Sequence, residues 1–160
     1  MEINFIALLV SALVTLLVGM LWYSEKMFGG IWMRETGLTP EDLKKGSMLK
    51  IFGFTYLFSF FLAFIMQMLV IHQFGAMGMI GGDATKALPS YAAFMADYGI
   101  TFRTFKHGAL HGFMTGLFFA LPIIAINGLF ERKSWKYIWI HAGYWVITLT
   151  IMGAIICGWV

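Results

Sequence analysis

Two histidines one helical turn apart are the residues of this chain best placed to do chemistry. His107 and His111 are separated by a glycine, an alanine and a leucine. On a helix this spacing puts both imidazoles on one face, with about 6 Å of rise between them. Histidines at i and i+4 can bind one metal ion, as in zinc helices. No glutamate lies between them to act as a base, so the pattern does not indicate a zinc protease.

A third histidine is expected at the same depth as this pair. His72 ends a long apolar run, residues 48–72, and His107 lies at the start of the next one, residues 105–130. If each run is a helix that crosses a membrane, the end of the first and the start of the second lie on the same side. Asp83 or Asp97 can supply a fourth ligand for Zn²⁺ or Cu²⁺. Two histidines at equal depth on neighbouring helices can instead ligate a haem. The alternative without a cofactor is a set of neutral, hydrogen-bonded histidines among lipid head groups.

Glycines follow the same helix at intervals of four residues. Gly108, Gly112 and Gly116 line one face and form a ridge that lets another helix approach closely. The partner can be a helix of the same bundle or of a second copy, and the ridge makes a homo-oligomer our leading expectation. Pro122, further along, should kink this helix.

A second group of polar side chains interrupts the apolar runs: Gln67, Asn127, His141 and Tyr144. The two amides are costly in lipid and should point inward, where each can bond another helix or a ligand. We expect the four residues to line a solute path. His141 lies at the opposite end of its run from the other histidines and cannot join their cluster.

Four apolar runs must position these residues: 3–23, 48–72, 105–130 and 135–157. Each has the roughly 20 residues that a helix needs to cross a bilayer, and lipid leaves such a run no other way to pair its backbone. Only 12% of the residues are charged, against about 25% in soluble domains. We predict one all-α domain over residues 1–160, an integral membrane four-helix bundle in the lipid bilayer.

Short amphipathic helices are expected in the cytoplasmic and outer loops. Thr39 and Pro40 resemble a helix start that runs on into the second span. In the outer loop the glycines between 75 and 82 should break the chain, and residues 90–98 should form a helix that lies flat on the bundle.

The basic residues predict the orientation. Gaps 24–50 and 131–136 hold eight lysines and arginines, whereas the loop 73–106 and the two termini hold three. The positive-inside rule therefore places both termini outside. The net charge of +3 does not indicate nucleic acid, because the basic residues lie beside apolar runs, where lipid head groups would be.

Three stretches follow a known pattern: Leu21–Ser24 with Phe28, Gly29 and Trp32; Leu129–Lys136; and Ala142–Trp145 with Met152–Ile156. In this order they resemble the domain-of-unknown-function 1761 family of small membrane proteins. Glu25, where we would expect proline, and His141, where Asp or Asn looks commoner, depart from that pattern. The resemblance implies a mainly bacterial protein, hence the cytoplasmic membrane, and brings no agreed activity or catalytic residues. A polar group beside Tyr144 is then a candidate site element.

Three functions remain open. The first is a homo-oligomeric permease or channel-like protein for a small uncharged or weakly charged solute. The second is a membrane metal- or haem-binding protein, or a small redox enzyme, that uses the outer histidines. The third is a structural or accessory subunit. No charged residue lies deep in a span, which disfavours an ion-coupled pump. Since the chain has no Ser–His–Asp set, phosphate loop or CxxC, we lean away from an enzyme.

Overall fold

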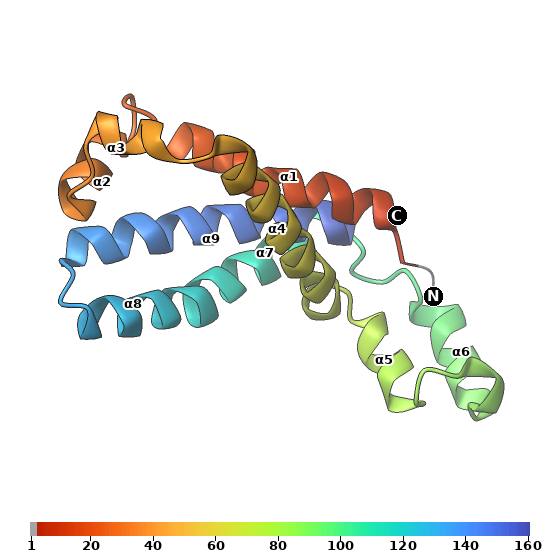
Figure 1. Cartoon of the computed structure of the whole chain (residues 1–160). Coiled ribbons are helices and arrows are strands. Elements are labelled where there is room, and N and C mark those ends of the chain that lie inside the picture. The colour runs from red at the N-terminus through yellow and green to blue at the C-terminus, as the bar shows by residue number, and fades with distance from the viewer. Residues whose placement is uncertain (1–2) are drawn as a thin grey trace.

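The protein is all helical over the residues that the structure describes, 3–160, in this computed structural model (Figure 1). Four helical segments are long and apolar enough to cross a membrane: α1 (Phe5–Trp22), α4 (Met48–Val70), the third segment Phe105–Phe130, and α9 (Trp135–Gly158). The predicted fold class and the four apolar runs are confirmed, with bounds shifted by at most two residues.

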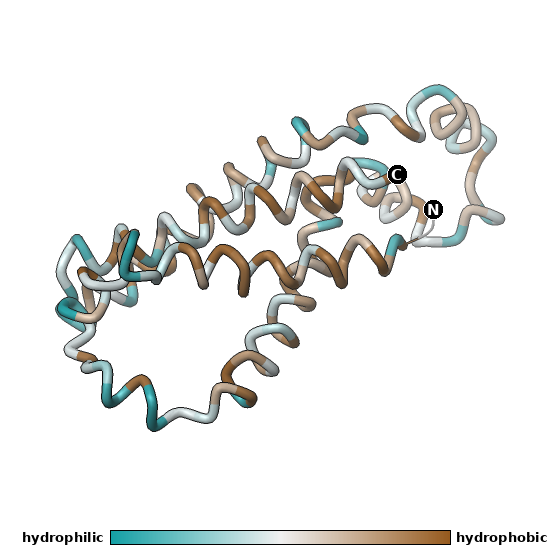
Figure 2. Tube along the Cα trace, turned by 90° about the horizontal axis from the view of Figure 1, so that it is seen from above, coloured by the Kyte–Doolittle hydropathy of each residue, from teal (hydrophilic) through white to brown (hydrophobic). Residues whose placement is uncertain are grey.

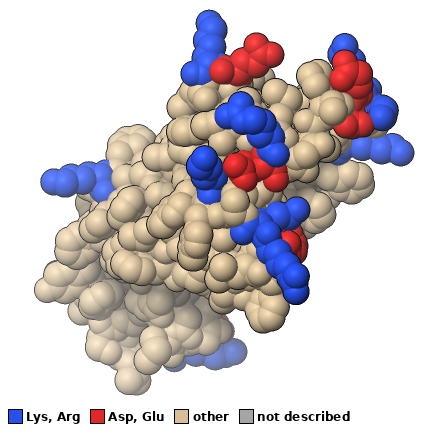
Figure 3. Space-filling view, turned by 90° about the vertical axis from the view of Figure 1, so that its left-hand side faces the viewer, with Lys and Arg blue, Asp and Glu red and all other residues tan. Residues whose placement is uncertain are grey.

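Successive long helices run in opposite directions, so their connections gather at two ends of the molecule (Figure 1). The charged end carries α2 (Gly29–Thr36), α3 (Pro40–Lys45) and the turn into α9. Figure 3 looks onto this end and shows lysines and arginines interspersed with acidic residues. The histidine end carries α5 (Gln73–Met79), the short 3₁₀ helix η1 (Ala84–Lys86) and α6 (Pro89–Tyr98). The long helices between the ends are mostly apolar (Figure 2).

The loop helices follow local signals in the sequence. Thr39 begins α3 with a capping box, in which its hydroxyl accepts the Asp42 amide proton at 3.2 Å. However, α3 ends before α4, which has its own cap at Ser47, so the predicted continuous helix is wrong. Helix α6 matches the predicted 90–98 segment. It does not lie flat on the bundle as predicted, because it projects with α5 beyond the ends of the long helices (Figure 1).

Two short helices, α2 and α5, were not predicted. Helix α5 passes through Gly75 and Gly78, which we expected to break the chain. The break comes at Gly81 and Gly82 instead, where φ is +70° and +81°, a backbone region that favours glycine. Counting glycines located the loop but not the two residues that turn it.

Helix α9 forms the centre of the bundle. Half of its most apolar stretch is buried, against a third or less in the other three spans, and it packs against α1, α4 and the third segment. Two hydrogen bonds between polar groups of the interior join α1 to its neighbours, as interhelical bonds commonly do in lipid. Tyr144 on α9 donates to the Thr15 carbonyl oxygen on α1 at 2.9 Å, and the Thr15 hydroxyl pairs with Ser59 on α4.

The glycine ridge packs against α9 of the same chain. A Cβ added at Gly108 or Gly112 would lie 2.8 Å from the carbonyl carbon of Gly153 or Leu149, closer than real Cβ atoms come. One at Gly116 would lie 2.6 Å from the Val146 Cα. The ridge is therefore occupied within one chain, and it supplies no argument for a homo-oligomer.

The third segment is not a continuous α-helix. Helix α7 (Phe105–Thr115) passes into a π-helical turn, η2 (Gly116–Ala120), before α8 (Leu121–Phe130). The Leu121 amide donates to the Gly116 carbonyl oxygen, five residues back. Pro122 has no amide proton, and in a regular helix its ring would clash with the carbonyl four residues earlier. The wider π turn contains that carbonyl. This turn is the irregularity that the structure shows beside Pro122, where we predicted a kink.

We expect Gly112→Ala to lower the midpoint temperature of unfolding of the detergent-solubilised protein, followed by circular dichroism. The added methyl has to push α7 from α9, and overpacking of this kind costs about 1–3 kcal/mol. Gly53→Ala on α4 is the matched control, because nothing lies within 4 Å of a Cβ there. The control should be neutral or stabilised by up to about 1 kcal/mol. Equal midpoints for the two variants would contradict the close packing of α7 on α9.

Candidate metal centre

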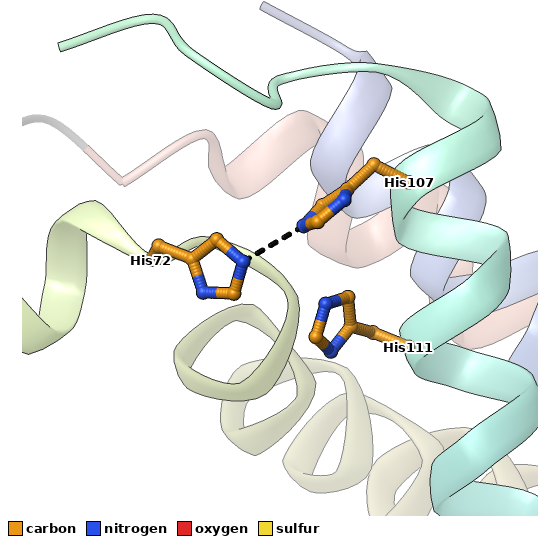
Figure 4. A group of neighbouring side chains, drawn as sticks. All are labelled: His72, His107 and His111. Atoms are coloured by element: carbon orange, nitrogen blue, oxygen red, sulfur yellow. Dashed lines mark hydrogen bonds between the residues drawn. The ribbon is translucent and has the colours of Figure 1, made fainter. Parts of the chain in front are cut away.

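Three histidines from two neighbouring helices converge at the histidine end (Figure 4). His107 and His111 extend from α7, and His72 from the junction of α4 and α5. One potential ligand nitrogen from each ring lies within 4.8 Å of the other two. The ring centroids are 4.5–5.0 Å apart. The structure thus brings together the three residues that the sequence predicted as metal ligands.

Local backbone geometry positions His72. Helix α4 ends at Val70, and Ile71 is extended, with φ −114° and ψ 100°. This one residue turns the chain before α5, so His72 leaves the α4 axis and reaches α7 (Figure 4). On α7 the histidines follow a face adjacent to the glycines, so the packing of that ridge on α9 leaves their face free for α4.

The ring nitrogens already contact one another. The Nε2 atoms of His72 and His107 are 2.9 Å apart, so one imidazole donates its proton to the other. His72 is exposed, and the other two histidines are partly buried. A cluster open on one side and backed by helix on the other is accessible to a small ion.

The spacing fits a bare metal ion better than a haem. Two nitrogens bound to one tetrahedral Zn²⁺ are about 3.3 Å apart, since Zn–N bonds are about 2.0–2.1 Å long. The cluster needs only small side-chain rotations to reach that separation. A haem between His72 and His107 would need room for a macrocycle where the two nitrogens now touch. Three histidines also leave one coordination position open, as in catalytic zinc sites.

The acidic residues that we considered as fourth ligands are not part of this cluster. Within residues 3–160, the group of potential ligands around His72 contains histidines alone. Asp83 instead caps η1, where it accepts hydrogen bonds from Thr85 and pairs with Lys86 at 3.1 Å. Hydrogen bonds from Thr85, and then from Lys86, lower the pKa of the Asp83 carboxyl. Asp97 lies on α6 and does not join the histidines either.

Phe102 lies against the cluster. Its ring stacks on His107, with centroids 5.0 Å apart and planes at 25°, and meets His72 edge-on at 6.0 Å. Phe102 has a left-handed backbone with φ 65°, which is costly for a residue with a side chain. The loop holds it there: Arg103 donates to the carbonyl oxygen of Cys157 at 2.9 Å, and the Phe102 carbonyl accepts from the Thr104 amide.

Gln73 fastens the same loop from the other side. Its side chain is 4% exposed, and its Nε2 donates to the carbonyl oxygens of Tyr98 and Thr101 at 2.8 and 3.0 Å. Sequence reasoning missed both Gln73 and Phe102. The position of Gln73 beside His72 at a span end was a usable signal, but no sequence feature indicated a left-handed phenylalanine.

The family comparison confirms the resemblance found in the sequence. The profile of the family described as "Protein of unknown function (DUF1761)" matches residues 6–157, nearly the whole chain. The chain belongs to this family. Neither the comparison with curated proteins nor the one with solved structures finds a significant match.

The second predicted polar group does not come together in this DUF1761 protein. Gln67 is 2% exposed on α4 and lines a cavity of about 20 Å³ near Arg103, which has room for roughly one water molecule. Asn127 lies exposed on α8 rather than inside the bundle. His141 and Tyr144 lie on the half of α9 that begins at the charged end. The four residues occupy three separate places.

His141, where the resemblance led us to expect Asp or Asn, belongs to an aromatic group. Its Nδ1 lies 3.1 Å from the Tyr23 hydroxyl, and its ring centroid is 4.3 Å from that of Tyr137. Tyr144 packs on Tyr23 at 5.3 Å. These contacts tie α1 to α9, which makes His141 part of the helix packing at this end.

We expect Gln73→Met to speed hydrogen–deuterium exchange in residues 99–104, because both hydrogen bonds that the Gln73 Nε2 donates to Tyr98 and Thr101 are lost, whereas Met keeps the volume. Gln67→Met is the matched control: the same change at a similarly buried position whose Nε2 has no hydrogen-bond partner among the described residues. Exchange of 99–104 should be unchanged in the control. Identical exchange in both variants would show that Gln73 does not hold the loop.

Proposed function

We propose that this DUF1761-family protein is a membrane metal-binding protein whose site is the cluster of His72, His107 and His111. The observation that supports this most is the convergence of one nitrogen from each ring within 4.8 Å. Imidazole is a borderline ligand that suits Zn²⁺, Cu²⁺ and neighbouring divalent ions. The ion would replace the proton that His72 and His107 share, and the three rings would leave one position for water or a substrate.

The site takes its metal from the outer side of the membrane in this proposal. The charged end carries most of the lysines and arginines, and the positive-inside rule assigns such an end to the cytoplasm. The histidine end then faces outward, with His72 exposed there. A bacterial cytoplasmic membrane would place the site at the periplasmic surface.

The permease that we considered first has less support. It required Gln67, Asn127, His141 and Tyr144 to line one path, and they lie apart in the single chain. It also relied on oligomers built through the glycine ridge, which α9 occupies. An accessory role has no specific contact in its favour. The histidine cluster is the one predicted site whose members meet.

We expect the purified protein to bind one Co²⁺, a spectroscopic substitute for Zn²⁺, and to show the visible absorption of tetrahedral coordination. His107→Ala and His111→Ala should each weaken the affinity by at least about 10–100-fold, the loss typical of supporting residues alone. Zn²⁺ at about 100 times its dissociation constant should stabilise the wild type by about 2.7 kcal/mol. Both single variants should lose most of that thermal shift.

His141→Ala provides the matched control, since it removes the one histidine outside the cluster. Its metal-dependent shift should equal that of the wild type, whatever its own midpoint. Three further results would each count against the proposed site. They are a metal-free wild type, metal binding that survives His107→Ala, and equal loss in His141→Ala.

A further inference from the structure

An apolar groove extends from the histidine cluster along the bundle. It encloses about 720 Å³ between α4 and the third segment, with α9 as its floor. Volumes of this size hold small-molecule ligands in other proteins, roughly 300–1,000 Å³. His111 lines one end, and Leu69, Met114, Phe118 and Ile123 are among the residues along its length. The metal site and the groove therefore share a side chain.

Polar side chains are few in the groove, and two of them, His111 and Thr115, lie at this end. Besides His111, the polar side chains that line the groove are Thr115, one helical turn further along, and the indole of Trp145. The Thr115 hydroxyl donates to the His111 carbonyl oxygen at 2.8 Å, so its polarity is used within the helix. The rest of the surface is aliphatic, aromatic or sulfur-containing. A ligand that fits it has one polar end and a long apolar body.

The π turn forms part of the groove wall. Phe118, Phe119 and Ala120 all belong to η2 and all line the groove. Single π turns within α-helices occur frequently at functional sites. Because the groove lies in the membrane-spanning part of the chain, what surrounds it is hydrocarbon, and its natural occupant is a lipid chain.

The metal site favours an anionic head group. Three neutral imidazoles leave a divalent ion with its full charge, which is costly beside a bilayer without a counter-anion. One open position accepts one oxygen. A carboxylate supplies that oxygen together with a negative charge. Arg103 already donates to the carbonyl oxygens of Cys157 and Trp159, whereas Lys106, which precedes His107, is exposed and adds a cation on the same side of the cluster.

We propose that the groove holds the chain of a long-chain fatty acid, and that the fatty-acid carboxylate occupies the open position of the metal bound by His72, His107 and His111. This inference rests on the proposed metal site and names its ligand class. The chain lies along α8 towards Ile123, and the carboxylate lies beside His111 at the histidine end.

The test uses the full-length Co²⁺-loaded protein in phosphatidylcholine nanodiscs, with palmitic acid as the probe and hexadecanol as the uncharged comparison. Palmitic acid should change the visible Co²⁺ spectrum, and hexadecanol should not. Ala120→Trp, which fills the groove, should abolish the change while keeping the starting spectrum. Ile126→Trp, on an exposed position of α8 outside the groove, should respond like the wild type.

A second measurement on the wild type needs no variant. Palmitic acid with a diazirine at its chain end, photolysed in the same nanodiscs, should label residues 118–124 in preference to other lipid-facing helix surfaces. Labelling spread evenly over the spans, or no spectral change with palmitic acid, would overturn the fatty-acid site and leave the metal site standing. A spectral change that persists in Ala120→Trp would also overturn it. If the wild type forms no Co²⁺ spectrum, the proposed metal site fails, and the fatty-acid site with it.

Discussion

Where α7 crosses α9, the two backbones are in direct contact, with Gly108 against Gly153 and Gly112 against Leu149. Lipid surrounds both helices with apolar groups, so burial of apolar surface does little to bring them together, and close van der Waals packing must do it. Glycine makes such packing possible, and it also fixes the rotation of α7. With the glycine face against α9, the histidine face has one orientation, towards the end of α4.

The rest of the site depends on this rotation. His72 can meet the α7 histidines only because Ile71 turns the chain as α4 ends, and Phe102 can cover them only because Gln73 and Arg103 hold the loop. The polar atoms involved lie at helix ends, where backbone groups already need partners. The protein thus builds its polar cluster at the edge of the apolar layer, without placing charge inside it.

Patterns along the chain predicted what depends on length and spacing. The four apolar runs predicted the four long helices, and Thr39 with Pro40 predicted the start of α3. The expected equal depth of His72, His107 and His111 in the membrane predicted that these three side chains meet. Which face of each helix points into the bundle was harder to predict. When a helix is apolar on all sides, its sequence does not indicate which face is buried. We therefore predicted that Asn127 points inward, but the structure shows it exposed.

For the same reason the sequence could not predict which helix packs against the glycine ridge. The spacing of the glycines is the same whether the ridge packs on the next helix or on a second copy of the chain. Only the structure shows that α9 packs against it. Phe102 has a left-handed backbone, and its carbonyl oxygen accepts hydrogen bonds both from the nearby Thr104 amide and from the distant Cys157 thiol. No local propensity encodes such a conformation.

The π turn at Gly116–Ala120 acts as a correction of register. Gly128 is twelve residues beyond Gly116, which in an unbroken α-helix is three and a third turns, about 120° away from the glycine face. One extra residue in a turn sets the following helix back by about 100°, which returns Gly128 close to that face. Gly128 indeed lies against Ile138 of α9. A single widened turn therefore lets one helix follow its partner along the full depth of the membrane.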